Sequence, residues 1–245
     1  MHYGIQLYSV RDLTQSQGIL ETLRCVAAIG YKSVEFAGFG TASAAEIRAE
    51  LDTLGLSVDG AHIGIKDLSP ETIDQTIANM KTIGNSRIII PAAKLTNKET
   101  IALFLEKLAF AMPKLQAAGF EVGFHNHDVE FLPNEDGIIP MHVLEEQTDL
   151  FFELDTYWAY HVGLDPVAEM ERMGKRLRMI HIKDGIPSLG HQGGKPLGMG
   201  KAPVRAVYEA ALEKGLPIIV ESETLTPDGP TEADICYRYL KTLEN

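Results

Sequence analysis

Histidines and acids gather where several hydrophobic runs of this sequence end. The stretch GFHNHDVEF, residues 123–131, places two histidines, an asparagine and two acids at the end of a β-strand pattern. Three later runs end in similar pairs, which are Glu153 and Asp155, His181 and Lys183, and Glu221 and Glu223. Imidazoles and carboxylates are typical ligands of divalent metal ions and typical groups for proton transfer.

The members of each pair are two residues apart, as are His125 and His127, so each pair shares one face of a strand. Polar side chains that point into a protein interior are costly unless they are satisfied. Four such pairs in succession indicate a common site, and Asp155, His181 and Glu221 together predict a metal centre. Two carboxylates with one or two imidazoles and no thiolate suit one Mn²⁺, Mg²⁺, Co²⁺ or Zn²⁺ ion.

Other polar residues at strand ends are less specific. A single histidine there more often makes a structural hydrogen bond, which is the first interpretation for His62. The same interpretation is stronger for His2, His142, His161 and His191. Asp128 and Asp184 are expected to cap the helices that follow them.

These residues must be positioned by a regular alternation of strand and helix patterns. Amphipathic helical patterns, such as residues 16–29 and 98–118, separate the β-rich runs, and Pro113 favours a kink or break in the second. The β-rich runs are residues 3–9, 33–37, 57–63, 87–92, 121–127, 151–156, 178–184 and 217–223. Eight such units in 245 residues predict an α/β fold, a single (β/α)8 TIM barrel domain over residues 1–245.

The competing fold is a doubly wound open sheet, whose first βα turn carries a glycine fingerprint. The corresponding segment here, YSVRDLTQSQG, lacks that fingerprint. Active sites of TIM barrels lie at the C-terminal ends of the strands. The polar pairs are therefore expected to meet at one mouth of the barrel.

Composition argues against some classes of function. The net charge of −12 argues against a nucleic-acid or anionic-membrane partner. No apolar run approaches membrane-spanning length, and the first ten residues have a strand pattern without the charged leader of a signal peptide. Cys25 and Cys236 lie in helical patterns without metal-type spacing, which favours two small buried residues in the reducing cytoplasm.

The chain resembles the sugar phosphate isomerase/epimerase family, the xylose isomerase-like TIM barrels that also include endonuclease IV. The resemblance covers nearly the whole length and rests on the order and spacing of several segments. These segments are GIQLYSVRD, VEFAG, GAHIG, GFHNHDVEF, ELDTYWAYHVGLDP, MIHIKDG, PLGMGKAPV and IIVESE.

Members of this family bind one divalent ion through Glu, Asp, His and Glu of strands five to eight. The resemblance implies Asp155, His181 and Glu221 as the last three ligands. His125 stands where the usual glutamate would be, as in a branch with the pattern HNHD-x-EF, and is the expected first ligand. Glu221 is preferred to Glu223 because it directly follows the apolar run.

The resemblance implies isomerisation or epimerisation next to a carbonyl of a ketose, keto-inositol or keto-glycoside, with Glu221 as ligand and base. Family epimerases pair two metal-bound glutamates, and the strand-five glutamate is missing here. Either Glu153, His127 or Glu130 replaces it, or the reaction needs one base, as in a dehydratase or lyase of the inosose dehydratase type.

Several residues have looser assignments. Lys183 either binds a substrate oxygen or stabilises an enediolate, or it forms a salt bridge to Glu153 or Glu221. Trp158 either stacks on a sugar, as does its neighbour Tyr157, or belongs to the core or a lid. The remaining candidates for substrate binding are His62, His127, Gln6 and Glu35, and Glu35 is also a candidate for holding a ligand in place.

The loop of residues 190–203 has five glycines, which either wrap an anion, close over substrate or simply give flexibility. The expected partner is a small sugar or polyol, and a homo-oligomer is compatible with the family. Two other classes are weighed. An endonuclease IV-like nuclease needs three zinc ions and basic loops, and a non-catalytic sugar-binding barrel has no need of the ligand set.

Overall fold

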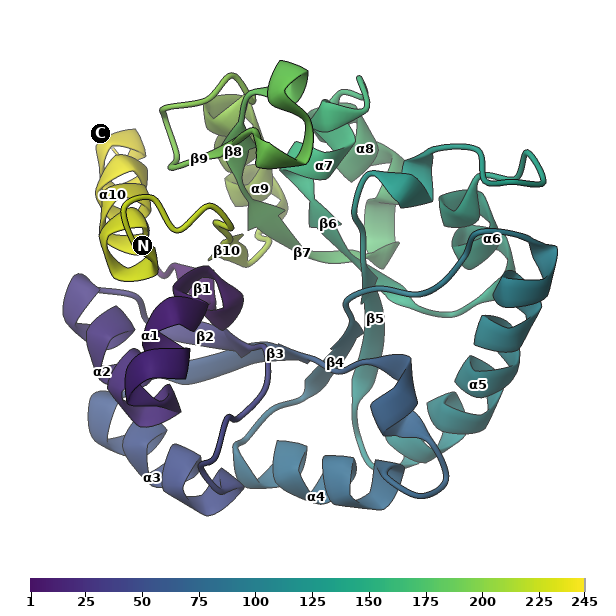
Figure 1. Cartoon of the computed structure of the whole chain (residues 1–245), viewed down its shortest axis with the longest axis horizontal. Coiled ribbons are helices and arrows are strands. Elements are labelled where there is room, and N and C mark those ends of the chain that lie inside the picture. The colour runs from purple at the N-terminus through teal and green to yellow at the C-terminus, as the bar shows by residue number, and fades with distance from the viewer. Residues whose placement is uncertain (245) are drawn as a thin grey trace.

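Parallel strands close into a barrel in this computed structural model, which describes residues 1–244. Asn245, the last residue of the predicted domain, lies outside the described residues. Within them, eight strands pair in the closed order β1-β10-β7-β6-β5-β4-β3-β2. The helices surround these strands, and the N-terminus lies beside α10 (Figure 1). The predicted (β/α)8 TIM barrel is confirmed.

The elements follow the predicted alternation. The barrel strands are β1 (Gly4–Gln6), β2 (Ser33–Phe36), β3 (Ser57–His62), β4 (Arg87–Ile90), β5 (Glu121–His125), β6 (Phe151–Asp155), β7 (Leu177–Ile182) and β10 (Ile218–Val220). A short antiparallel pair outside the barrel consists of β8 (Asp184–Gly185) and β9 (Gly194–Lys195). The α-helices are α1 (Arg11–Gln17), α2 (Ile19–Ile29), α3 (Ala44–Leu54), α4 (Ile73–Thr82), α5 (Lys98–Ala117), α6 (Pro140–Gln147), α7 (Thr156–His161), α8 (Pro166–Met173), α9 (Val204–Lys214) and α10 (Gly229–Leu243). The 3-10 helices are η1 (Leu7–Val10), η2 (Ile65–Leu68), η3 (Val129–Phe131), η4 (Gly174–Arg176) and η5 (Pro187–Gln192).

Some boundaries differ from the predicted ones. The first strand ends at Gln6, because the Gln6 side chain accepts a hydrogen bond from the Tyr8 amide and starts η1. The predicted helix over residues 16–29 is interrupted at Gly18, whose φ of 86° is outside the helical range. Pro113 does not break α5, which continues to Ala117.

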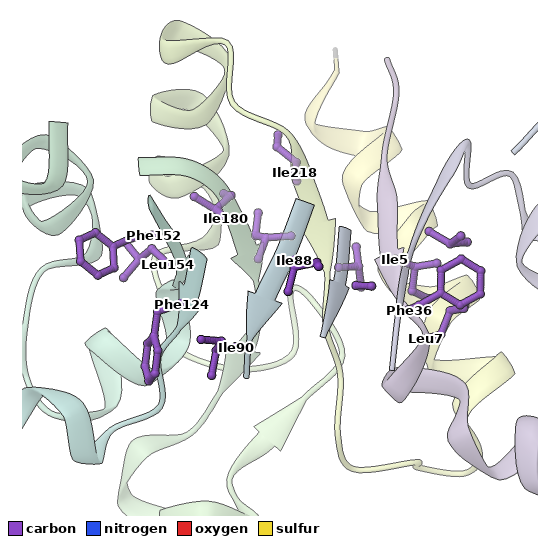
Figure 2. Packing of buried hydrophobic residues seen from close by; sticks show 14 of the residues in the cluster. Ile5, Leu7, Phe36, Ile88, Ile90, Phe124, Phe152, Leu154, Ile180 and Ile218 are labelled. Atoms are coloured by element: carbon purple, nitrogen blue, oxygen red, sulfur yellow. The ribbon is translucent and has the colours of Figure 1, made fainter. Parts of the chain in front are cut away.

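Alternating side chains divide the barrel strands into an outer and an inner face. The outer face packs against the helices through large apolar residues (Figure 2). The inner face begins with a separate apolar cluster of Ile89, Phe151, Met179 and Ile219. Gly123 makes room for it, because a Cβ there would lie 2.3 Å from the Phe151 ring. Polar residues occupy the inner face above this cluster.

Two expectations about composition have different outcomes. Among the described residues, no helix combines the length and apolar character needed to cross a bilayer. Cys236 is buried, as predicted, but Cys25 is only partly buried, so the prediction of two buried cysteines is wrong for Cys25. Cys25 lies at the rim of the packed face of α2, where solvent reaches one side of the helix.

A partly buried carboxyl group lies near the N-terminal end of the barrel. Ser33 donates a hydrogen bond to Asp59, and a Cβ on Gly4 would lie 2.4 Å from Asp59 Oδ2. Burial raises the pKa of Asp59 to about 6, because the Ser33 hydrogen bond offsets only part of the desolvation.

We expect Asp59→Asn to stabilise the fold at neutral pH. Since the folded-state pKa lies above the ordinary value, ionisation of Asp59 penalises the folded state, and this penalty develops as pH rises from about 4 to about 6. The gain in free energy of unfolding should grow from near zero at about pH 4 to about 1–3 kcal/mol above about pH 6.5. Urea unfolding across this range measures it, and a gain independent of pH would contradict the assignment.

Candidate metal centre

Four side chains from neighbouring strands converge at the C-terminal mouth of the barrel. His125 and Asp155 end β5 and β6, His181 lies in β7, and Glu221 directly follows β10. All four are buried, and one ligand-type atom of each lies within 4.8 Å of the others. We call these residues the outer set. They are the ligands expected from the sequence, and the structure brings them together.

Asp155 fits a cation ligand because only one of its oxygens is used by the protein. Oδ1 accepts hydrogen bonds from the amides of Tyr157 (2.9 Å) and Trp158 (3.0 Å), at the start of α7. Oδ2 has no hydrogen-bond partner within residues 1–244, although it is buried, and it lies 3.7 Å from Lys183 Nζ. A buried carboxylate oxygen without a partner is costly, and a cation would remove that cost.

Carboxylates contact both ring nitrogens of His181. Its Nδ1 lies 3.2 Å from Glu221 Oε2, while its Nε2 lies 2.7 Å from Glu35 Oε2. Gln6 Nε2 also donates to Glu35 Oε2, at 2.7 Å. A carboxylate that accepts the second N–H of a ligating histidine fixes the tautomer and the orientation of the ring. This contact supports the expectation that Glu35 holds a ligand in place.

A second group of possible ligands lies directly beneath the outer set. It consists of His62, His125, Glu153 and His181, and we call it the inner set. Glu153 is its centre, with Oε2 lying 2.8 Å from His62 Nε2 and 3.2 Å from His125 Nδ1. Its Oε1 lies 3.2 Å from His181 Nε2. Glu153 is fully buried among these rings.

Charges in the two sets compensate one another. Burial acts to raise the pKa of Glu153 and Glu221, but the neighbouring cationic groups outweigh it and hold both pKa values well below the usual range. Burial lowers the pKa of His125 to about 3, so this ring is neutral. For His62 burial acts in the same direction, but Glu35 and Glu153 outweigh it and raise the pKa to about 10. A bound cation would replace protons here.

The outer set borders a hollow of about 320 Å³. Its lining consists of Tyr8, Ala37, His62, Pro91, Ala92, His125, His127, Glu221 and Glu223. Among the candidates for substrate binding, His62 and His127 line it, whereas Gln6, Glu35 and Trp158 do not. Trp158 is buried, with its ring 5.0 Å from that of His191 and 6.0 Å from that of His127. Its stacking on a sugar remains a prediction.

Lys183 has a partner that the sequence analysis did not name. Its Nζ lies 2.5 Å from Glu223 Oε2 and 3.6 Å from Glu221 Oε2, so the main salt bridge is to Glu223. Glu223 lines the hollow and belongs with the groups that can act on a ligand there. The sequence signal for a role of Glu223 is its spacing of two residues from Glu221, which places both side chains on the same face of the strand.

Glu130 and His127, two candidates to replace the missing glutamate as a base, differ in whether they line the hollow. Glu130 is buried and accepts a hydrogen bond from the His127 amide at 2.8 Å, and burial raises its pKa to about 7. It is absent from the lining of the hollow, whereas His127 is part of it. Burial lowers the pKa of His127, which keeps its ring neutral and able to accept a proton.

The glycine-rich loop is anchored by Asp184. Its carboxylate accepts hydrogen bonds from the amides of Gly185, Gly198, Gly200 and Ala202, at 2.7 to 3.0 Å. Gly200 must be a glycine, because a Cβ would lie 2.1 Å from Asp184 Oδ1. The prediction that Asp184 caps a helix is therefore wrong. Its carboxylate instead occupies the loop amides that an anion would need. Asp128 does act as a cap, accepting from the Val129 amide at the start of η3.

Comparison with known proteins identifies the family. A family model described as xylose isomerase-like TIM barrel matches residues 23–242. The chain belongs to this family. Several solved structures resemble this chain in fold. Their sequence identity to it is low, so the similarity establishes the fold alone. Curated proteins include no match to this chain.

Three of these structures illustrate the range of related proteins. A sugar phosphate isomerase/epimerase from Parabacteroides distasonis has a TM-score of 0.82 and 20% identity, over 98% of this chain and 97% of that chain. An L-ribulose 3-epimerase has a TM-score of 0.72 and 17% identity, over 99% and 94%. The probable 3-DHS dehydratase AsbF from Bacillus anthracis has a TM-score of 0.76 and 14% identity, over 100% and 99%. Proteins with epimerase and dehydratase names thus share this architecture.

We expect Asp184→Asn to loosen the glycine-rich loop without unfolding the barrel. The amide group would place N–H donors opposite backbone N–H donors, so some of the loop hydrogen bonds would be lost. Hydrogen exchange at Gly198, Gly200 and Ala202 should accelerate roughly 10- to 100-fold. Asp149→Asn, at an exposed position, is the matched control, and unchanged exchange in the loop would contradict the anchoring role.

Proposed function

We propose that this protein is a divalent-metal-dependent sugar isomerase or epimerase. Its substrate is a ketose, keto-inositol or keto-glycoside, and the reaction moves a proton at the carbon next to the carbonyl. The observation that carries the proposal is the convergence of the outer set within 4.8 Å beside an open hollow. The epimerases and isomerases among structural neighbours support the same class of reaction.

The outer set supplies ligands of the right chemistry for Mn²⁺, Mg²⁺, Co²⁺ or Zn²⁺. A divalent ion held there would act as a Lewis acid toward a carbonyl oxygen of the substrate. Lys183, whose ammonium lies 3.6 Å from Glu221 Oε2, adds positive charge next to the same position. Its pairing with Glu223 keeps that ammonium fixed rather than mobile.

Glu221 is the proposed base. Its carboxylate lines the hollow, and Lys183 and His181 hold its pKa low against the effect of burial, so it is ionised at neutral pH. His127 is the proposed second proton-transfer group, because it lines the same hollow and has a neutral ring. Glu153 lies among three histidines beneath the ligands, where we propose that it orients their rings.

A dehydratase or lyase is the second candidate. The observation in its favour is His125, which replaces the first carboxylate of the family pattern and cannot easily accept a proton while bound to a metal. A single base would then remove the α-proton, and the neighbouring Lys183 ammonium would protonate the departing hydroxyl. The dehydratase among the structural neighbours is compatible with this alternative. For either reaction we propose the cytoplasm as the location, on the evidence of two free cysteines.

We expect Glu221→Gln and Asp155→Asn to lower kcat/KM at least about 100-fold, since each removes a charged ligand and the first also removes the base. The assay is NMR in D₂O over a panel of ketoses and keto-inositols, with the metal content of each variant measured in parallel. Glu99→Gln, exposed on α5, is the matched control. Near-normal turnover in Glu221→Gln would remove the proposal.

We expect His127→Gln to separate the two directions of an epimerisation. With one of two bases missing, the variant should still exchange deuterium into the epimer whose proton Glu221 removes, while interconversion falls about 100-fold or more. Loss of water instead of exchange would favour the dehydratase. Equal loss of exchange from both epimers would show that His127 is not the second base.

A further inference from the structure

We infer that the inner set forms a second, deeper cation site that selects Zn²⁺ and whose occupation excludes an ion from the outer set. The inference concerns His62, His125, Glu153 and His181, of which His62 and Glu153 take no part in the outer set. It does not depend on which reaction the protein catalyses.

The imidazole nitrogens of the inner set lie at about the distance from the Glu153 carboxylate that ligands of one zinc ion would have. Zinc binds nitrogen and oxygen at about 2.0–2.2 Å, so the ligand atoms of a tetrahedral site lie about 3.3 Å apart. The atoms around the Glu153 carboxylate lie 2.8 Å from it in His62, 3.2 Å in His125 and 3.2 Å in His181. Small side-chain shifts would therefore complete the cage.

Two atoms of the inner set lack a hydrogen-bond partner within residues 1–244, whereas His62 Nε2 is paired with Glu153 and His181 Nε2 with Glu35. Glu153 Oε1 and His125 Nδ1 are buried and have no hydrogen-bond partner in the described part of the chain. Both side chains are less than a tenth exposed, with His125 Nδ1 lying 3.2 Å from Glu153 Oε2 and Glu153 Oε1 lying 3.2 Å from His181 Nε2. Unpaired polar atoms in such a place are costly, and a cation between them would satisfy both.

The two sets compete for His181 as long as its ring is a neutral imidazole, because they use opposite nitrogens of that ring. His181 presents Nδ1 to Glu221 in the outer set and Nε2 to Glu153 in the inner set. A neutral imidazole has one nitrogen with a free lone pair, and the other carries a proton. An ion in the inner set therefore leaves Nδ1 of His181 protonated and directed at the outer position.

Ligand types give the two sets different preferences. The inner set offers three imidazoles and one fully buried carboxylate, which suits four-coordinate zinc. The outer set offers two imidazoles and two carboxylates beside a hollow, which leaves positions open for water or substrate oxygens and suits Mn²⁺ or Mg²⁺. Excess zinc should thus act as an inhibitor that competes with loading of the outer set.

The test uses the full chain stripped of metal, with Zn²⁺ alone, Mn²⁺ alone or both. His62→Gln alters only the inner set, and Glu221→Gln alters only the outer set. Zinc X-ray absorption gives the number of bound imidazoles, titration calorimetry gives the zinc affinity, and electron paramagnetic resonance gives the manganese affinity. Circular dichroism checks folding, and Glu153→Gln is the second inner-set variant if His62→Gln does not fold.

We expect zinc bound by three imidazoles in the wild type. His62→Gln should lower the zinc affinity at least about tenfold and change the manganese affinity less than about threefold. Glu221→Gln should have the opposite pattern, and zinc should displace manganese one for one. Zinc with two imidazoles, equal losses of zinc affinity in both variants, or manganese and zinc bound together on one chain would each overturn the inference.

Discussion

Compensation of buried charge inside a closed barrel is the constraint on which the site depends. Glu35, Glu153 and Glu221 are almost fully removed from solvent, and each would be prohibitively costly as an isolated anion. His62 and His181 form hydrogen bonds with them, and His125 Nδ1 lies 3.2 Å from Glu153 Oε2. Since removing one member leaves its partners buried and unpaired, the cluster behaves as a unit, and the apolar layer below it can stay dry.

The same side chains that serve the site also build the fold. Asp155 caps α7 with one oxygen and presents the other to the outer set. Thr156, the next residue, donates to the His181 carbonyl at 2.8 Å and ties α7 to β7. The carboxylate is thus oriented by a helix N-terminus and a neighbouring strand before any ligand binds, which lowers the cost of organising the site.

Period-two spacing was sufficient to predict the barrel and the convergence of the outer set, because both follow from alternation along single strands. Contacts between strands across the barrel could not be predicted from this spacing. Glu35 reaches His181 only because β1 closes the sheet between β2 and β10, and Asp184 meets Gly200 only after the loop folds back. The apolar pattern predicts a continuous helix through Gly18, because such a pattern carries no information about the positive φ of a single glycine.

In the proposed metal site, a histidine at position 125 gives the outer set a different charge from the one a carboxylate there would give. Burial raises the pKa of Asp155 to about 7, so a divalent ion bound in the proposed site would also displace its proton. With His125 neutral, Asp155 and Glu221 would then bring two negative charges, which would balance the two positive charges of the ion. A glutamate at the position of His125 would leave a net negative set. Lys183 pairs with Glu223, so Glu223 would add no unpaired negative charge beside a bound substrate. If the proposed function holds, His125 would leave the site without one carboxylate base and would also lower the repulsion of an oxyanion.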